Sequence, residues 1–210
     1  MTAPKRFLDT GDRLISFAIE EVQVLCPRCK SPGIVQASFD RYRTPSWHNR
    51  FSCTQCCLAL SSEAHHWLGP IRLQGRRPCG FCGHQWLMPC LHYASPPASL
   101  PEHLTATCPA CKRQTEVSVA MSRELPQDRC IDPHFGLPLR LTTPTRHGTV
   151  WAYNRRHLDA LDAFVNADLR ETQGSNYSNN TLFSVLPRWM KLAKHRSEIA
   201  KALLKLRTMR

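Results

Sequence analysis

Short runs of alternating apolar and polar residues fill the first 125 residues, a pattern typical of half-buried β-strands. The runs come in two successive sets of the same order, and turn-forming residues separate the runs within each set. The expected strands are residues 21–25, 34–39, 50–52 and 58–60, and then 71–74, 85–88, 103–107 and 116–119. We therefore expect two small units, residues 1–66 and 67–125, each built around a three-stranded β ribbon.

The pattern changes after residue 126. A turn at residues 145–148 lies between two apolar runs and predicts a β-hairpin. Apolar residues then recur at three- and four-residue spacing from residue 158 to 169, which predicts a helix beginning near Arg155 and capped by Asn154. Hairpin and helix together form a third expected unit, residues 126–170.

The C-terminal part is expected to be a polar linker at residues 171–180 followed by a helical segment at 181–210. Pro187 is expected to break this segment, because proline removes a helix donor and clashes with the preceding turn. Ser197 is in position to cap the final helix.

Four C-x-x-C pairs interrupt the expected strands. Each such turn presents two thiols to one point, and two turns on adjacent hairpins complete a tetrahedron of sulfur around a metal ion. The spacing predicts two structural Zn²⁺ ions, the first held by Cys26, Cys29, Cys53 and Cys56 and the second by Cys79, Cys82, Cys108 and Cys111. The predicted fold class is thus a small, metal-stabilised α+β protein: two tandem four-cysteine zinc ribbons, a β-hairpin and a basic helical C-terminus.

Several alternatives to this ligand set stay open. Cys57 could replace Cys56, although the two-residue spacing of the other pairs favours Cys56. The pairs could also cross-brace, 26/29 with 79/82, but sequential closure needs shorter loops and is favoured on entropy. Iron of the rubredoxin kind uses the same ligands. Cys90 and Cys130 are expected to be small buried apolar side chains.

The chain carries 28 Lys and Arg against 16 Asp and Glu, a formal net charge of +12. Two four-cysteine zinc sites would lower this to roughly +8, because each adds four thiolates and one divalent ion. A polyanionic partner is therefore expected. The odd total of 11 cysteines and the lack of an apolar leader after Met1 favour reduced thiols and a cytoplasmic location. No apolar run has the length of a membrane span.

Two regions have the residue types that bind nucleic acid. The tip of the first ribbon interleaves arginines with aromatic side chains that can stack on unpaired bases, and residues 188–210 hold eight cations against the single acid Glu198. The expected contacts to DNA or RNA are Arg41, Tyr42, Arg43, Trp47, Arg50, Arg76, Arg77, Arg188, Lys191, Lys194, Arg196, Lys201 and Lys205. Packing of Trp47 against its own sheet is an equally good interpretation of that residue.

No catalytic constellation is evident in the sequence, so a non-enzymatic function is expected; a zinc-dependent nuclease is the least favoured alternative. The main alternative is a small adaptor subunit of a larger nucleoprotein complex in defence, transposition or transcription. Its docking face would consist of apolar C-terminal residues, although core packing explains them equally well; they are Leu182, Val185, Leu186, Trp189 and Met190.

The cysteine pairs resemble zinc ribbons of the transcription-factor-IIB type over residues 26–119. Residues 135–139, 150–154, 157–158, 186–191 and 193–194 are similar to the second half of uncharacterised bacterial tandem zinc-ribbon proteins. The resemblance implies a metal-dependent fold in a bacterial cytosolic protein. It implies no reaction, because a ribbon is specific for zinc and unspecific for function.

Overall fold

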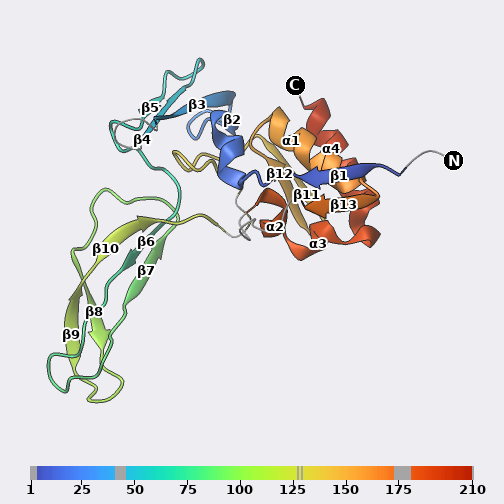
Figure 1. Cartoon of the computed structure of the whole chain (residues 1–210). Coiled ribbons are helices and arrows are strands. Elements are labelled where there is room, and N and C mark those ends of the chain that lie inside the picture. Colours follow the sequence, from blue (N-terminus) through green and yellow to red (C-terminus); the bar gives the residue numbers. More distant parts are fainter. Residues whose placement is uncertain (1–3, 41–45, 127, 129, 173–180, 210) are drawn as a thin grey trace. The chain divides into compact units, whose positions relative to one another are not determined.

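The computed structural model describes residues 4–40, 46–126, 128, 130–172 and 181–209 (Figure 1). The chain forms two compact units, residues 1–66 together with 128–210, and residues 67–127. The strands of both units are mostly antiparallel, and the helices belong to the first unit. The fold is a small α+β arrangement.

The first unit contains a four-stranded antiparallel sheet of β2 (Glu20–Leu25), β3 (Pro32–Asp40), β4 (Ser46–Ser52) and β5 (Ala59–Ser61), in that order. Val22, Val35, Phe51 and Leu60 are buried on one face, as the alternation predicts. The expected three-stranded ribbon was wrong by one strand. Residues 59–61 pair outside β4, so they extend the sheet at its edge.

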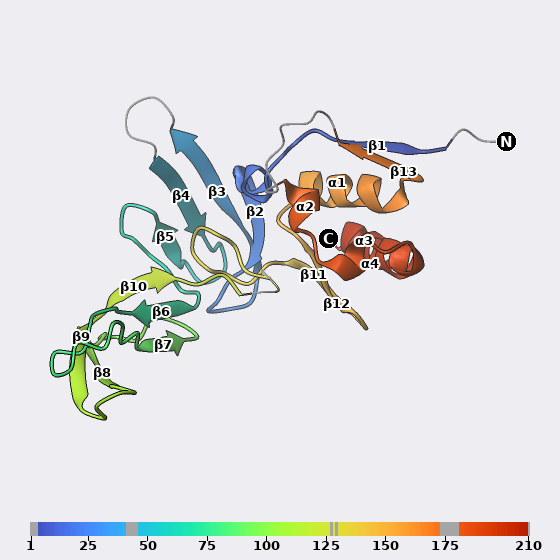
Figure 2. The same ribbon diagram turned by 60° about the horizontal axis from the view of Figure 1, so that its bottom comes forward.

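A hairpin and two helices complete most of the first unit. β11 (Leu141–Thr145) and β12 (Gly148–Ala152) pair around the predicted turn, and α1 (Arg155–Asn166) and α4 (Arg196–Thr208) pack beside them (Figures 1 and 2). The predicted cap of α1 is confirmed, because Asn154 Oδ1 accepts the N–H of His157 at 2.9 Å. The predicted cap at Ser197 is wrong: the 3₁₀ helix at Ala193–His195 leads directly into α4, so Ser197 lies inside the helix.

The remaining elements of this unit are short. β1 (Arg6–Asp9) pairs in parallel with β13 (Leu169–Thr172). A 3₁₀ helix at Leu14–Ala18 precedes β2, and α2 (Leu182–Val185) and α3 (Arg188–Lys191) lie on either side of Pro187, where the helix was expected to break.

One hydrophobic core runs through the whole first unit. Phe51 of the sheet, Phe135 of the following loop, Leu158 of α1 and Leu203 of α4 are all at most 2 % exposed and belong to the same cluster. The first cysteine-bearing sheet therefore shares its core with the C-terminal helices.

The second unit is a three-stranded sheet and a separate hairpin. The sheet has the order β10 (Ala120–Arg123), β6 (Ile71–Gln74) and β7 (Cys90–Tyr93), and the hairpin joins β8 (His103–Thr107) to β9 (Gln114–Ser118). A single three-stranded ribbon was therefore a wrong prediction for this unit. Residues 85–88 form no strand, because only Leu87 makes a bridge, to Arg77.

Candidate metal centres

The four C-x-x-C turns share one backbone conformation. In each, the residue after the second cysteine has a positive φ and its N–H donates to the carbonyl of the first cysteine at 2.9–3.1 Å; these residues are Lys30, Cys57, Gly83 and Lys112. The N–H of each first cysteine in turn donates to a carbonyl five residues later, at 2.8–2.9 Å. The repeated turn directs both thiols of a pair to one side.

The turns meet in the sequential pairs, giving one group of Cys26, Cys29, Cys53 and Cys56 and another of Cys79, Cys82, Cys108 and Cys111. Within each group the sulfur atoms all lie within 4.8 Å of one another, and the closest pairs are 3.4–3.7 Å apart. A regular tetrahedron with Zn–S bonds of about 2.3 Å has sulfur–sulfur edges of about 3.8 Å. Each group is thus suited to hold one metal ion.

Cys56 and not Cys57 belongs to the first group. Cys57 is exposed and has a φ of 56°, because it takes the left-handed position that Gly83 takes in the third turn. The sequence carried a signal for this, namely that glycine stands at the same position of another pair.

The four thiols of each group lie so close together that they cannot all lose their protons without a cation between them. The N–H groups of Phe81 and Cys82 lower the pKa of the Cys79 thiol to about 6. The N–H of His84 also lowers the pKa of Cys82, but the neighbouring thiols, Cys111 first, outweigh it and raise that pKa to about 12. Four thiolates this close repel one another unless a cation lies between them.

In the first group, too, the pKa of one thiol is lowered and that of another is raised. Hydrogen bonds from Ser31 lower the pKa of Cys29 to about 6. The N–H of Leu58 lowers the pKa of Cys56, yet burial and the neighbouring thiols raise it to about 12. A divalent ion at the centre of the four sulfurs would offset the repulsion between the thiolates.

The surroundings of the two groups differ. Cys26 and Cys53 belong to the large core of the first unit. Cys79 and Cys108 form a cluster of buried residues with only Leu87 and Val117, among the residues described. A metal ion at the second group therefore has far less hydrophobic packing to assist it.

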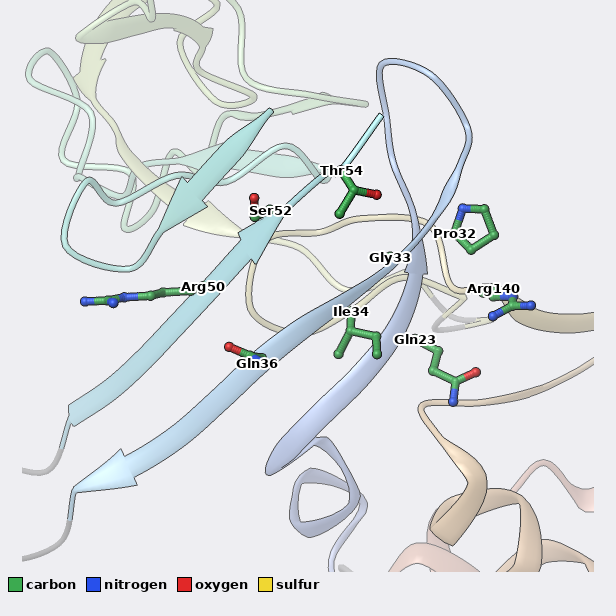
Figure 3. A pocket seen from close by; sticks show the side chains of 9 residues that line it. All are labelled: Gln23, Pro32, Gly33, Ile34, Gln36, Arg50, Ser52, Thr54 and Arg140. Carbon is green, nitrogen blue, oxygen red and sulfur yellow. The ribbon is translucent and has the colours of Figure 1, made fainter. Parts of the chain in front are cut away.

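A hollow of about 570 Å³ lies on the face of the first sheet opposite its core (Figure 3). Side chains of β2, β3 and β4 line it, with Gln36 and Ile34 between Arg50 on one side and Arg140 on the other in this view. Arg50 also lies 3.8 Å from Glu63. The predicted contact Arg50 thus lies beside amide and hydroxyl groups on an open sheet face.

A second hollow, of about 380 Å³, lies at the start of α4 and is lined by Arg146, Lys194, Ser197, Glu198 and Lys201. The guanidinium of Arg146 is 2.7 Å from the Glu198 carboxylate. Partial burial would raise the pKa of Glu198, but the N–H and the guanidinium of Arg146 outweigh it and the pKa is lowered. The hollow holds three cations against one carboxylate.

The other predicted contact residues are dispersed. Arg41, Tyr42 and Arg43 lie outside the described residues. Trp47 packs on the rings of Phe39 and His134, with centroids 4.9 and 5.0 Å away.

Two cations of the second unit are engaged within it. Arg76 lies over the ring of Trp86 at 3.6 Å, and Arg77 donates to the carbonyl of Glu116 at 3.0 Å.

In the basic C-terminal segment some cations contact other parts of the chain and others are exposed. Lys191 donates to the carbonyl of Ser184 at 2.7 Å, and Arg196 lies 3.5 Å from Asp168. Lys194 of the 3₁₀ helix and Lys201 and Lys205 of α4 are exposed. Lys201 and Lys205 are four residues apart and share a face of α4. Arg188 is exposed in α3.

Arg146 and Arg140 were missed by sequence reasoning. Arg146 stands in the β-hairpin turn and Arg140 in the loop before β11, and neither lies in a run of cations. Only the pairing of β11 with β12 and their packing on α4 bring Arg146 to the lysines. No signal in the sequence marks them.

A search of family models, curated proteins and solved structures found no match to this chain. The resemblance to bacterial tandem zinc-ribbon proteins therefore stays a prediction. None of the described helices has the length and apolar character needed to cross a membrane. The site defines a small α+β protein with two tetracysteine groups, each suited to one metal ion.

Proposed function

We propose that this is a zinc-dependent nucleic-acid-binding protein. Two structural Zn²⁺ ions occupy the tetracysteine groups, since four thiolates in a closed tetrahedron are typical of structural zinc and leave no position for a substrate. The metal holds the turns in place, and the basic surfaces make the contacts.

The basic hollow at the start of α4 is the observation that carries the proposal. Lys194 of the 3₁₀ helix and Lys201 of α4 line it, and the Arg146–Glu198 ion pair holds the hairpin turn beside them. Ser197 adds a hydroxyl in the first turn of α4, where the helix dipole favours an anion. Phosphate oxygens are the anionic groups that such a set of donors binds.

The sheet hollow supplies a second surface within the same unit. Gln36, Ser52 and Thr54 offer hydrogen-bonding groups that can reach base or ribose edges, and Arg50 with Arg140 offers charge for the backbone. The adaptor alternative has less support, because Leu182 and Met190 of its expected docking face are buried in the core.

Salt-dependent binding tests the proposal. We expect the zinc-loaded protein to bind a labelled oligonucleotide more tightly at about 50 mM than at about 200 mM salt, because phosphate contacts release counterions. Lys201→Glu should weaken binding and lower the salt slope by about 0.7–0.9 per lost contact. Lys5→Glu makes the same charge change at an exposed lysine that does not line the hollow and should have little effect.

Single-stranded DNA, duplex DNA and RNA are compared in the same titration. Absence of binding at both salt concentrations, or equal loss in Lys201→Glu and Lys5→Glu, would contradict the proposed surface. Zinc content and circular dichroism of each variant verify that the fold is retained.

A further inference from the structure

The exposed face of the three-stranded sheet in the second unit carries a cysteine, a histidine and a glutamate together. Cys90 and His92 alternate along β7 and so project from the same face. Their cross-strand partners in β6 are Gln74 and Arg72, and Arg72 is in turn paired with Ser122 of β10. Glu124 follows Ser122 by two residues and therefore returns to that face.

The three side chains form a continuous hydrogen-bonded chain. The Sγ of Cys90 lies 3.3 Å from Nε2 of His92. The other ring nitrogen of His92, Nδ1, lies 2.8 Å from a carboxylate oxygen of Glu124. A nucleophile within hydrogen-bond reach of a base, whose second nitrogen is held by a third group, is the arrangement that activates thiols.

We propose that Cys90 is a nucleophilic thiol, activated by His92 as base and positioned through Glu124, that forms mixed disulfides with low-molecular-weight disulfides. This reactivity is independent of the zinc sites and of nucleic-acid binding. The expected burial of Cys90 was wrong, because Cys90 is exposed. The side chain of His92 is 58 % exposed, so a small reagent can reach the sulfur. Arg72, the cross-strand partner of His92, adds a positive charge that favours an anionic reagent.

The exchange step is balanced within the site. His92 takes the proton of the Cys90 thiol, and the thiolate attacks one sulfur of the disulfide. A new sulfur–sulfur bond forms as the old one breaks, and the departing thiolate receives the proton from the imidazolium. Cys90 is oxidised to the mixed disulfide, and half of the reagent is reduced to free thiol.

The other two cysteines outside the metal groups provide an internal comparison. Cys57 is exposed, and Cys130 donates to the carbonyl of Asp128 at 3.4 Å. Burial, followed by the charge of Asp128, raises the pKa of Cys130 to about 11, which keeps it protonated and unreactive. Among the residues described, no hydrogen bond joins either of these sulfurs to an imidazole.

A metal site is the competing interpretation of the same residues. Cys90 and His92 could both be ligands, with Glu124 behind the histidine. Within the described part of the chain, however, groups of three or more potential ligands occur only at the two tetracysteine groups. Two ligands at an exposed site do not complete a zinc coordination shell, so the thiol reactivity is favoured.

The experiment treats the zinc-loaded full chain with oxidised glutathione and locates the adducts by peptide mass spectrometry. We expect Cys90 to be modified at least tenfold faster than Cys57 or Cys130. His92→Gln should slow the Cys90 reaction about tenfold or more, because the thiol loses the base that takes its proton. Glu124→Gln should give a smaller reduction.

Ser122→Ala is the matched control on the same face and should react like the wild type. Equal rates at Cys57 and Cys90 in the wild-type protein would overturn the proposal without any variant. An unchanged Cys90 rate in His92→Gln would do the same. A third zinc ion per chain that protects Cys90 from glutathione would identify a metal site instead.

Discussion

The guanidinium of Arg155, the first residue of α1, donates to the carbonyl of Met209 at 2.6 Å, one residue beyond the end of α4. It also donates to the carbonyls of Leu206 and Arg207, at 3.2 and 2.7 Å. The last carbonyls of a helix have no partners within the helix, and a cation there is further favoured by the helix dipole. One side chain thus joins the start of α1 to the end of α4.

Replacing Arg155 tests this joint. Arg155→Ala should lower the free energy of unfolding by about 2–3 kcal/mol, because a charged hydrogen bond contributes about 1.5–3 kcal/mol and partly buried carbonyls lose their donors. Arg155→Lys keeps the charge but not the forked geometry, so its free energy of unfolding should lie between those of the wild type and Arg155→Ala. Chemical denaturation followed by circular dichroism measures the difference. Equal stability of the alanine variant and the wild type would show that water replaces the guanidinium at no cost.

His157 should make the first unit sensitive to acid. Burial lowers its pKa to about 3, against about 6.5 in an unfolded chain. Its Nδ1 accepts the N–H of Tyr153 at 3.2 Å, so the neutral ring is the form that fits. The unfolded chain takes up a proton below pH 6.5 and the folded chain does not until about pH 3. The stability is therefore complete above pH 6.5 and declines as the pH falls from 6.5 towards 3, by about 1.4 kcal/mol per unit.

The measurement compares the unfolding free energy of zinc-loaded wild type and His157→Gln at pH 7.5 and 5.5. The wild type should lose about 1.4 kcal/mol more than the variant over this interval. Acid effects on the metal groups are common to both proteins and cancel in the difference. An identical loss in both would remove His157 as the cause.

Loss of metal from the two tetracysteine groups should unfold different amounts of the protein. Cys29→Ser and Cys111→Ser should each leave about one zinc ion per chain. In Cys111→Ser the β8–β9 hairpin should lose its amide protection, because the second group is supported by few buried residues. In Cys29→Ser the helices α1 and α4 should persist, because the large core of the first unit extends well beyond the cysteines. Metal analysis and hydrogen exchange read out both effects; loss of all protection in both variants would contradict the prediction.

Cys57 should be dispensable for metal binding and constrained by its backbone. Cys57→Gly should retain two zinc ions with unchanged or slightly raised stability, since glycine adopts a φ of 56° freely. Cys57→Val should retain the metal and lose roughly 1–2 kcal/mol, because a β-branched side chain is strained in this region. Thermal unfolding with metal analysis separates the two. Loss of one zinc ion in the glycine variant would restore Cys57 as a ligand.

Gly75 should be required where the sheet of the second unit approaches β9. A Cβ there would lie 2.2 Å from the backbone carbonyl oxygen of Ser118, which cannot rotate away. Gly75→Ala should therefore lower the stability of this unit by roughly 1–3 kcal/mol, the range for overpacking. Gly80→Ala is the matched control, because a Cβ there meets no atom within 4 Å. Hydrogen exchange of β6 and β9 compares the variants, and equal protection would refute the close approach.

Local chemistry explains what could be predicted. The C-x-x-C turns and their grouping follow from spacing and short loops, and the cap at Asn154 follows from the start of an apolar helical pattern. Sheet membership was less predictable. Residues 59–61 could close a ribbon or extend an edge, and the alternation of apolar residues is the same in both cases.

A count of charges in the sequence does not show which cations are paired with acids in the folded chain. Residues 188–210 contain eight cations and one acid, yet Arg207 lies 2.7 Å from Asp159 and Arg196 lies 3.5 Å from Asp168. These acids come from elsewhere in the chain, so part of the apparent basic excess is compensated by ion pairs. Lys194 and Lys201 line one hollow together with Arg146, which comes from the hairpin turn.

The sequence by itself determined the C-x-x-C turns, the two groups of four cysteines that they form and the helix that follows Asn154. Each turn and the cap depend on residues within a few positions of one another, and each group joins two cysteine pairs that follow one another along the chain. The tertiary structure alone decided which cations stay unneutralised and that Cys90, His92 and Glu124 meet on one sheet face. Those relationships join residues far apart in the chain, and they exist only after the strands have paired and the helices have packed.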